Sequence, residues 1–223
     1  MQDDPMLGTQ ESTFSTVLQT NKVLKNTYML LSMTLLFSAA CAAGSMAIGL
    51  GYIPALVCSL VALGLLWFVL PKTQDSAAGI GVVFAFTGLL GASIGPMLSH
   101  YLSLPNGSSL VMQAMGGTAI VFFALSGYAL TTRKDFSYLG GFLMVGLIVA
   151  IVASLANLFF QVPAVSLAVS SAIVLIMSGF ILFDTSRIVN GGETNYIRAT
   201  VGLYLSIHNL FSSMLHLLGV MDE

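Results

Sequence analysis

The sequence predicts an all-α protein that crosses a membrane several times, and two features of its composition support this. Only 7% of the 223 residues are charged and 57% are hydrophobic, whereas a soluble domain carries about 25% charged residues. The hydrophobic residues gather in runs of about 20, the length at which an α-helix crosses the hydrocarbon core of a bilayer. Since backbone groups in lipid must bond within their own segment, helices rather than open strands are expected.

Seven runs are long and apolar enough to span a membrane. In chain order they cover residues 28–50, 53–70, 77–102, 110–131, 138–160, 163–184 and 199–220. The first run follows a polar stretch rich in Ser, Thr, Gln and Asp, and it is longer than the roughly 7–15 apolar residues of a signal peptide. We therefore predict a flexible cytoplasmic tail at residues 1–27 and a seven-helix transmembrane domain at residues 28–223.

The basic residues predict the orientation of these helices. Alternate crossings place every Lys and Arg of the chain on one side, and the loops on the other side contain neither. The positive-inside rule makes the basic side cytoplasmic. The N-terminus then lies in the cytoplasm and, after an odd number of crossings, the C-terminus lies outside. The basic residues are Lys22, Lys25, Lys72, Arg133, Lys134, Arg187 and Arg198.

Small residues in the third helix predict close packing against a neighbour. Gly91 and Gly95 have the GxxxG spacing, and Gly88 lies about one turn earlier. Such residues let backbones approach each other where no hydrophobic effect drives helices together. Pro96 removes a backbone hydrogen bond within the same apolar run, so we also expect a kink there.

The seventh helix carries an unusual polar face. Its small and polar residues recur at spacings of four, three, four and three, which place them on one side of a helix, within a sector of about 80°. Polar groups on a membrane helix face protein rather than lipid, so we predict that the other six helices surround the seventh. The face supplies either packing hydrogen bonds between helices or a functional polar seam, and comprises Gly202, Ser206, Asn209, Ser213 and His216.

Asp184 is the one acidic residue expected within the membrane, at the cytoplasmic end of the sixth helix. Arg187 follows three residues later, a spacing at which side chains meet on a helix surface. The pair is interpreted either as an ion pair at the helix end or as a gate, in which the proton on Asp184 decides whether a cytoplasmic plug is closed. His208 lies on another face of the seventh helix, near Tyr204. It is either a hydrogen-bonded core residue or, where solvent reaches it, a proton sensor.

The composition and the motifs argue against several classes of function. A net charge of −2 and the lack of a basic stretch argue against a nucleic-acid partner. Cys41 and Cys58 lie inside apolar runs and match no metal or redox motif, so neither a cofactor nor a metal is expected. The GxSxG pattern around Ser93 lies within a helix, not at the strand-to-helix turn of a serine hydrolase. We therefore predict no enzymatic activity, with hydrolysis at Ser93 assisted by His208 or His216 as the alternative.

Several blocks of the sequence resemble one known family. FILFDTSRIV at the end of the sixth helix, and GGETNYIRATVGLYLSIHNLF after it, are similar to the C-terminal signature of the Bax inhibitor-1 family. That family is also called TMBIM, for transmembrane Bax inhibitor motif. Blocks that resemble it follow in order from Lys22 onward: KVLKNTYMLLSMTL, AFTGLLGASIGP and GGTAIVFFALSGYALTTRKDFSYLGG. The resemblance is closest to the bacterial YccA-like branch, whose members are described as modulators of the protease FtsH.

The resemblance implies six helices around a central seventh, a bacterial inner (plasma) membrane location and two activities. One activity is a pH-sensitive calcium leak, set by two aspartates that link the sixth and seventh helices and by an arginine from the second helix. The other, in the YccA-like branch, is binding to the membrane-bound, ATP-dependent protease FtsH, which slows its digestion of membrane proteins. The N-terminal tail is implied in that contact.

The leak site of the family is matched only in part. Asp184 matches the aspartate of the sixth helix, but the position in the seventh helix, within the frame LYLxxxN, is Ser206. The second helix has no arginine, and Lys72 at its end is the nearest base. A single carboxylate cannot share a proton with a second one, and it offers a divalent cation half the negative charge.

We therefore expect an inhibitor or substrate-like binder of FtsH that acts in membrane-protein quality control. A pH-sensitive leak for calcium or other cations, with protons as the regulator, is the alternative. The candidate gate or latch residues are Asp184, Arg187, Ser206, His208 and Asn209.

Overall fold

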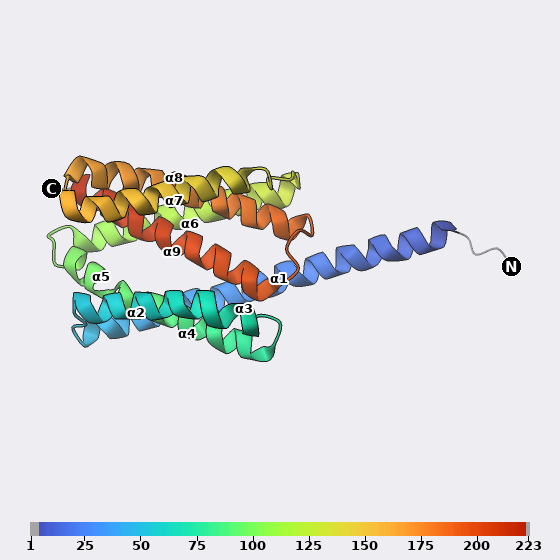
Figure 1. Cartoon of the computed structure of the whole chain (residues 1–223), viewed down its shortest axis with the longest axis horizontal. Coiled ribbons are helices and arrows are strands. Elements are labelled where there is room, and N and C mark those ends of the chain that lie inside the picture. The colour runs from blue at the N-terminus through green and yellow to red at the C-terminus, as the bar shows by residue number, and fades with distance from the viewer. Residues whose placement is uncertain (1–4, 222–223) are drawn as a thin grey trace.

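The computed structural model describes the backbone of residues 5–221 and the side chains of residues 19–221, and in this part of the chain it contains helices and no strands (Figure 1). Its α-helices are α1 (Pro5–Ala47), α2 (Tyr52–Gly64), α3 (Leu70–Thr73), α4 (Ala77–Ser93), α5 (Gly95–Leu102), α6 (Gly107–Thr132), α7 (Leu139–Phe160), α8 (Pro163–Val189) and α9 (Tyr196–Met221). A π-helix, η1 (Leu65–Val69), joins α2 to α3. Together they form seven segments that are long and apolar enough to cross a membrane, which confirms the predicted all-α fold.

Proline interrupts two of the seven segments. In the third segment, α4 ends at Ser93 and α5 begins at Gly95, so the break falls directly before Pro96 and confirms the expected kink. Proline lacks the N–H group that continues the ladder, and its ring clashes with the preceding turn. In the second segment Pro71 follows the π-helix, whose wider turn accommodates the same loss.

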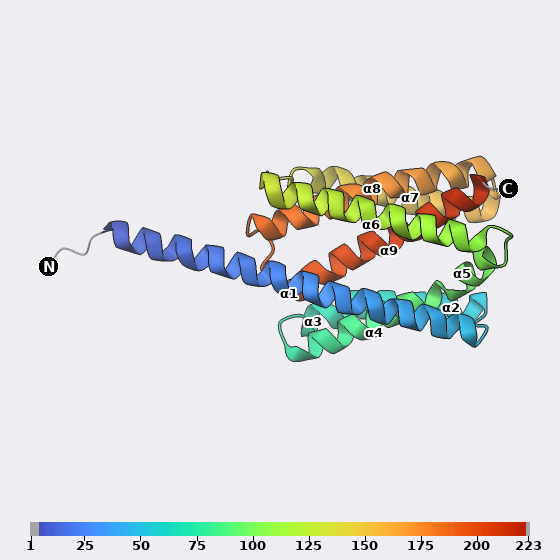
Figure 2. The ribbon, with the colours of Figure 1, turned by 180° about the vertical axis from the view of Figure 1, so that it is seen from behind.

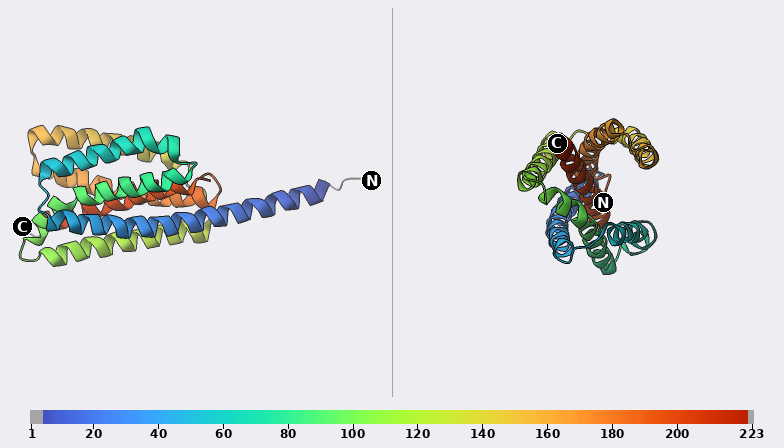
Figure 3. Two further views of the ribbon diagram at one scale, coloured as in Figure 1. Left: turned by 90° about the horizontal axis from the view of Figure 1, so that it is seen from below. Right: turned by 90° about the vertical axis from the view of Figure 1, so that its left-hand side faces the viewer.

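Helix α9 runs through the middle of the bundle (Figure 3). It packs against α1, α4, α6 and α8, and α8 is its most extensive neighbour. Segment α2 packs mainly against α4, and α7 mainly against α8. The predicted central helix is therefore present, with α2 and α7 in outer positions behind the helices that contact α9 directly.

The outer surface of the bundle is apolar, as contact with lipid requires. Large hydrophobic side chains are widely exposed on α2 and α7, among them Ile53 (78% exposed), Phe142 (76%) and Phe159 (87%). Lipid chains are as apolar as these side chains, so such a surface is stable in a bilayer. Leu203 and Leu210 of α9, by contrast, are fully buried, so the core is built around that helix.

The glycines predicted to mark close packing bring α4 and α5 against α1. A Cβ atom at Gly91 would contact the backbone of Ser38, and one at Gly95 would overlap the Ser45 side chain. The prediction of a small-residue contact is thus confirmed, and its partner is α1. We call this region the glycine contact. It joins Gly88, Gly91 and Gly95 to Phe37, Ser38, Cys41 and Ser45.

Helix α1 begins well before the membrane-spanning part and projects beyond the rest of the bundle (Figures 1 and 2). Residues 5–27, expected as a flexible tail, belong to this helix, while residues 1–4 lie outside the described part of the chain. Val23 and Leu24 already pack against the core, and Thr27 is fully buried. The packed bundle therefore starts before residue 28.

All the loops that carry basic residues lie at one end of the bundle. Figure 1 shows the N-terminal end, together with the loops before α4, α7 and α9, on the side opposite the C-terminus. The structure thus gathers the basic residues as the sequence predicts. We call this side the basic end and the other side the opposite end.

The positive-inside rule predicts that the basic end lies in the cytoplasm and that, after seven crossings, the C-terminus lies outside. Alkaline phosphatase fused after Glu223 should therefore be active in intact cells, because this enzyme needs disulfides that form outside the cytoplasm. The control fusion, placed after Lys134 in the loop between α6 and α7, should be inactive. The reverse result at these two positions would invert the topology.

Candidate functional site

The candidate site lies at the basic end, where a short hairpin joins α8 to α9. The backbone N–H groups of Gly192 and Glu193 donate to the carbonyl oxygen of Arg187, at 2.8 and 3.1 Å, and so close the end of α8. Gly191 has a φ of 75°, a left-handed conformation that glycine adopts without strain. The paired glycines thereby turn the chain directly back toward α9.

Glu193 is the buried acid of this hairpin, with 7% of its side chain exposed. Its Oε2 atom lies 3.1 Å from Nε of Arg198 and 3.7 Å from Nη2 of Arg187. Its Oε1 atom accepts a hydrogen bond from the backbone N–H of Asn195 at 3.0 Å. Arg187 also donates to the carbonyl oxygen of Gly192 at 3.0 Å. One carboxylate therefore joins the last turn of α8 to the first turn of α9.

Asn195 caps the start of α9 and fastens it to a second loop. Its Oδ1 atom accepts hydrogen bonds from the N–H groups of Ile197 and Arg198, at 2.9 and 3.1 Å, the arrangement of an N-cap. Its Nδ2 atom donates to the carbonyl oxygen of Gln74 at 3.0 Å and to Oδ1 of Asp75 at 2.7 Å. The loop between α3 and α4 is thus attached to the central helix.

The loop between α6 and α7 is attached to the same region. Ser186 Oγ donates to the carbonyl oxygen of Lys134 at 2.9 Å and accepts the N–H of Phe136 at 2.9 Å. Asn190 Nδ2 donates to the same Lys134 oxygen at 3.3 Å. These contacts join all three loops of the basic end. We call the residues that make them the hairpin cluster: Ser186, Arg187, Asn190, Glu193, Asn195 and Arg198.

Asp184 lies in the last turns of α8 and faces α9. A Cβ atom at Gly202 would be only 2.9 Å from Asp184 Oδ2, so the carboxylate fits there because position 202 is glycine. Among the described residues no ion pair joins Asp184 to Arg187, and the gate, the other interpretation of these two residues, stays a prediction. Arg187 pairs with Glu193 instead, and its guanidinium lies 5.5 Å from the centre of the Phe183 ring. The hairpin provides a carboxylate where a long cationic side chain can reach toward water, which favours that partner over one inside the bundle.

Ser206 and Asn209, two of the predicted site residues, bond to their own helix. Ser206 Oγ donates to the carbonyl oxygen of Gly202 at 3.1 Å, and Asn209 Nδ2 donates to that of Leu205 at 2.8 Å. The structure therefore brings Asp184 beside the turn that holds Gly202 and leads to Ser206. In the described part of the chain no hydrogen bond connects Asp184 to Ser206. Within the described residues neither Ser206 nor Asn209 forms a hydrogen bond to another helix; each donates to a carbonyl oxygen one turn earlier in α9.

Tyr204, which lies off the predicted polar face, makes polar links from α9 to two other helices. Its hydroxyl donates to the carbonyl oxygen of Thr87 at 3.1 Å and lies 2.6 Å from Ser38 Oγ, so Ser38 acts as the donor in the second bond. The ring of His208 stacks on the Tyr204 ring, with centroids 5.8 Å apart. Tyr204 joins α9 to α4 and α1. The sequence signal for this link is a hydroxyl-bearing aromatic residue within an apolar helix.

His216 fastens α9 at the opposite end. Its Nε2 atom lies 2.9 Å from Ser166 Oγ on α8, and its Nδ1 atom lies 3.2 Å from the hydroxyl of Tyr101 on α5. His216 thus fulfils the packing interpretation of the polar face. Ser93 Oγ donates to the carbonyl oxygen of Leu90 at 2.8 Å. The alternative of hydrolysis at Ser93 therefore lacks a pairing with His216, whose two ring nitrogens are both occupied by other groups.

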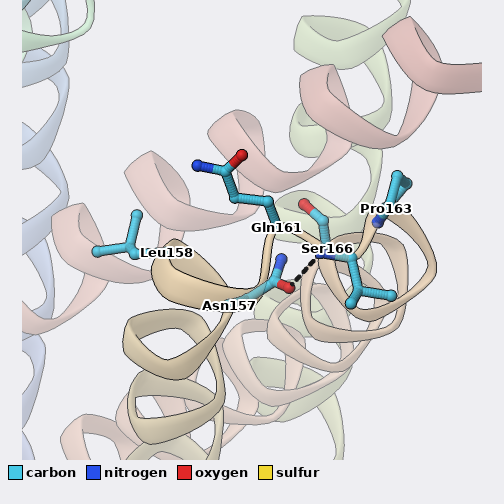
Figure 4. Close-up of a pocket in the computed structure, with 6 residues that line it drawn as sticks. Asn157, Leu158, Gln161, Pro163 and Ser166 are labelled. Atoms are coloured by element: carbon cyan, nitrogen blue, oxygen red, sulfur yellow. Dashed lines mark hydrogen bonds between the residues drawn. The ribbon is translucent and has the colours of Figure 1, made fainter.

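A shallow depression of about 290 Å³ lies at the opposite end, beside the loop between α7 and α8 (Figure 4). The N–H of Val162 donates to Asn157 Oδ1 at 3.0 Å within it. Asp184 lies near the other end of α8, about 30 Å away along the helix axis at 1.5 Å per residue. The depression is thus separate from the hairpin cluster. It is lined by Asn157, Leu158, Gln161, Val162, Pro163 and Ser166.

Comparison with known proteins gives matches along nearly the whole chain. A family model described as inhibitor of apoptosis-promoting Bax1 matches residues 20–223. A membrane protein of Vibrio cholerae serotype O1 is 53% identical over 215 residues, which cover 96% of each chain. The Escherichia coli K12 protein called modulator of FtsH protease YccA is 52% identical over 205 residues, which cover 92% of this chain and 93% of that protein. The inner membrane protein YccA of Escherichia coli O6:H1 is similar to the same extent.

The substitution Glu193→Gln keeps the size of the side chain but removes the charge that two arginines face. We expect the free energy of unfolding to fall by about 1–2 kcal/mol, less than for a fully buried ion pair, because Arg198 is 56% exposed. The midpoint of thermal unfolding in detergent should drop by about 2–8 °C. Asp135→Asn is the control, since the Asp135 carboxylate bonds Ser137, two residues away in an exposed turn, and it should leave the midpoint unchanged. Equal midpoints for both variants would show that the hairpin does not depend on the Glu193 carboxylate.

Proposed function

The chain belongs to the family of inhibitors of apoptosis-promoting Bax1, the Bax inhibitor-1 family, and from this membership we propose that it is an inner-membrane modulator of the ATP-dependent membrane protease FtsH. The observation that carries the proposal is the similarity, along nearly the whole chain, to the Escherichia coli protein named a modulator of that protease. In this proposal the chain binds FtsH and slows its digestion of other membrane proteins. It would thereby act in membrane-protein quality control.

The structure supports a mechanism in which FtsH binds this chain but does not extract it from the membrane. A processive protease that removes proteins from a membrane has to pull on an accessible segment and then separate it from its neighbours. The projecting part of α1 offers such a segment at the basic end, which we assign to the cytoplasm (Figure 1). The bundle behind it is fastened by the hairpin cluster at one end and by His216 at the other. FtsH would therefore stay occupied by a chain that resists removal.

This mechanism requires binding and mechanical resistance, and no chemical step on this chain. The proposed partner is the FtsH complex within the same bilayer. The relative from Escherichia coli K12 is named as a modulator of a protease. We therefore propose that the chain is not an enzyme.

A cation leak through the bundle is the second candidate, and the position of Asp184 is the observation in its favour. The carboxylate points toward α9 beside Gly202, between the two helices whose separation would open a path. The second acid of a two-carboxylate latch is replaced by Ser206, which bonds its own helix. Within residues 19–221, no three His, Cys, Asp or Glu side chains gather closely enough to hold a metal ion. This arrangement supports the modulator more than the leak.

The role of the projecting segment can be tested by replacing it. In cells that overproduce the full chain, a membrane-protein substrate of FtsH should live several-fold longer. Replacing residues 2–20 with a Gly/Ser linker of equal length should return the lifetime to its value without the chain, because the linker is flexible and lacks the helix that FtsH contacts. Pulse-chase labelling measures both lifetimes. Equal protection by the linker variant would contradict a role for this segment.

A second prediction separates the modulator from the leak. Asp184→Asn should change the lifetime of the FtsH substrate by less than twofold, since protease engagement does not depend on that carboxylate. Liposomes that contain the wild-type chain should release calcium no faster than empty liposomes at pH 6 and at pH 8. A pH-dependent calcium flux that Asp184→Asn abolishes would instead favour the leak.

A further inference from the structure

Helix α1 transmits force from its projecting part to its membrane-spanning part. It is one helix of 43 residues, from Pro5 to Ala47, and at 1.5 Å per residue it extends about 65 Å. Figure 2 shows it running from beyond the basic end along the side of the bundle. A pull on its N-terminal part acts along the helix axis, so resistance to extraction must come from the contacts of the spanning part.

The glycine contact is the closest of those contacts and opposes axial movement. Helices α1 and α4 run in the same direction, and the contacts of α1 follow in order along it, Ser38 at Gly91 of α4 and Ser45 at Gly95 of α5. Each glycine leaves room for the facing turn of α1, which a side chain would fill. Sliding α1 by less than a full turn of about 5.4 Å moves its residues away from the glycines and against side chains of α4.

Two aromatic rings oppose movement toward the basic end in particular. Phe84 lies one turn before Gly88 on α4, and its ring meets that of Phe37 edge to face, with centroids 5.4 Å apart. An added Cβ atom at Gly88 would lie 2.7 Å from the Phe37 ring, so that ring rests between Gly88 and Phe84. Movement of α1 toward the basic end presses Phe37 against Phe84, and Phe37, which is 41% exposed, has to leave this contact before α1 slides past.

A hydrogen bond joins the same level of α1 to the central helix. Ser38 donates to the hydroxyl of Tyr204, which in turn donates to the carbonyl oxygen of Thr87. Extraction of α1 breaks the first bond inside the bundle, where no water replaces it. The Ser38 backbone is also the group that Gly91 accommodates. Close packing and hydrogen bonding therefore both resist the removal of α1 at Ser38.

We propose that the glycine contact, together with the bond between Ser38 and Tyr204, determines whether this chain occupies FtsH or is digested by it. The inference rests on the proposed function and names the residues that make the chain a modulator. With the contact intact, α1 resists axial extraction and the protease remains occupied. With the contact weakened, α1 leaves the bundle and the chain becomes a substrate.

The test compares two glycine substitutions in the same helix. Gly91→Ala places a methyl group against the Ser38 backbone, whereas a Cβ atom at Gly81 of α4 would meet nothing within 4 Å. The full chain, purified FtsH, ATP and a membrane-protein substrate of FtsH are combined in liposomes, and both half-lives are followed. We expect Gly91→Ala to shorten the half-life of the chain at least fivefold and to abolish protection of the substrate. Gly81→Ala should match the wild type in both.

A second variant tests the hydrogen bond without adding volume. Tyr204→Phe keeps the ring and removes the hydroxyl, and it should shorten the half-life of the chain about twofold. Thermal unfolding without protease is recorded for each variant. If Gly91→Ala is unfolded at the assay temperature, the test rests on Tyr204→Phe. If the wild type protects the substrate and both variants have the same half-life as the wild type, the inference is overturned. A wild type that gives no protection would overturn the proposed function itself.

Discussion

The absence of water in the hydrocarbon core is the constraint on which the rest of this structure depends. Every polar group placed there needs a partner from the protein, and the central helix α9 carries more polar groups than any lipid-facing helix could. Ser206 and Asn209 meet the constraint locally, by donating to carbonyl oxygens of their own helix. Tyr204 and His216 meet it across helices, and in doing so they fix α9 against α1, α4, α5 and α8.

The two ends of the bundle meet the same requirement with different chemistry. At the basic end, charged and amide side chains join three loops through backbone carbonyl and N–H groups, with Glu193 between two arginines. At the opposite end a single imidazole contacts two hydroxyl groups. Charged groups pair where water reaches part of the cluster, as at Arg198, whereas the contact at the other end uses hydroxyl groups. The central helix is thus attached at both of its ends.

Most of the fold could be predicted because its signals are local. The seven spans follow from the length of apolar runs, the kink from Pro96, and the close helix contact from the spacing of Gly91 and Gly95. Side-chain partners at the candidate site were harder to predict, because they depend on which helices become neighbours. The expected pair of Asp184 and Arg187 is close in sequence, yet Glu193 lies nearer to the guanidinium once the hairpin folds back.

Residues such as Asn195 were missed for the same reason. Its neighbours Gln74 and Asp75 lie more than a hundred positions earlier in the chain, and no periodic pattern reveals such a contact. Tyr204 carried a signal, as a hydroxyl inside an apolar helix, but the sequence did not indicate that this hydroxyl would bond to Ser38 and Thr87. Prediction therefore succeeded for helix positions and failed for polar contacts between distant segments.

The central position of α9 has a consequence for biosynthesis. It is the least apolar of the seven spans and the last to leave the ribosome. A helix with this composition partitions weakly into lipid by itself, so we expect it to enter the membrane against α8 and the other helices already there. Its polar groups then pass from water to protein without crossing bare hydrocarbon. The helices that surround α9 are thus synthesised before α9 itself, whose polar groups pack against them.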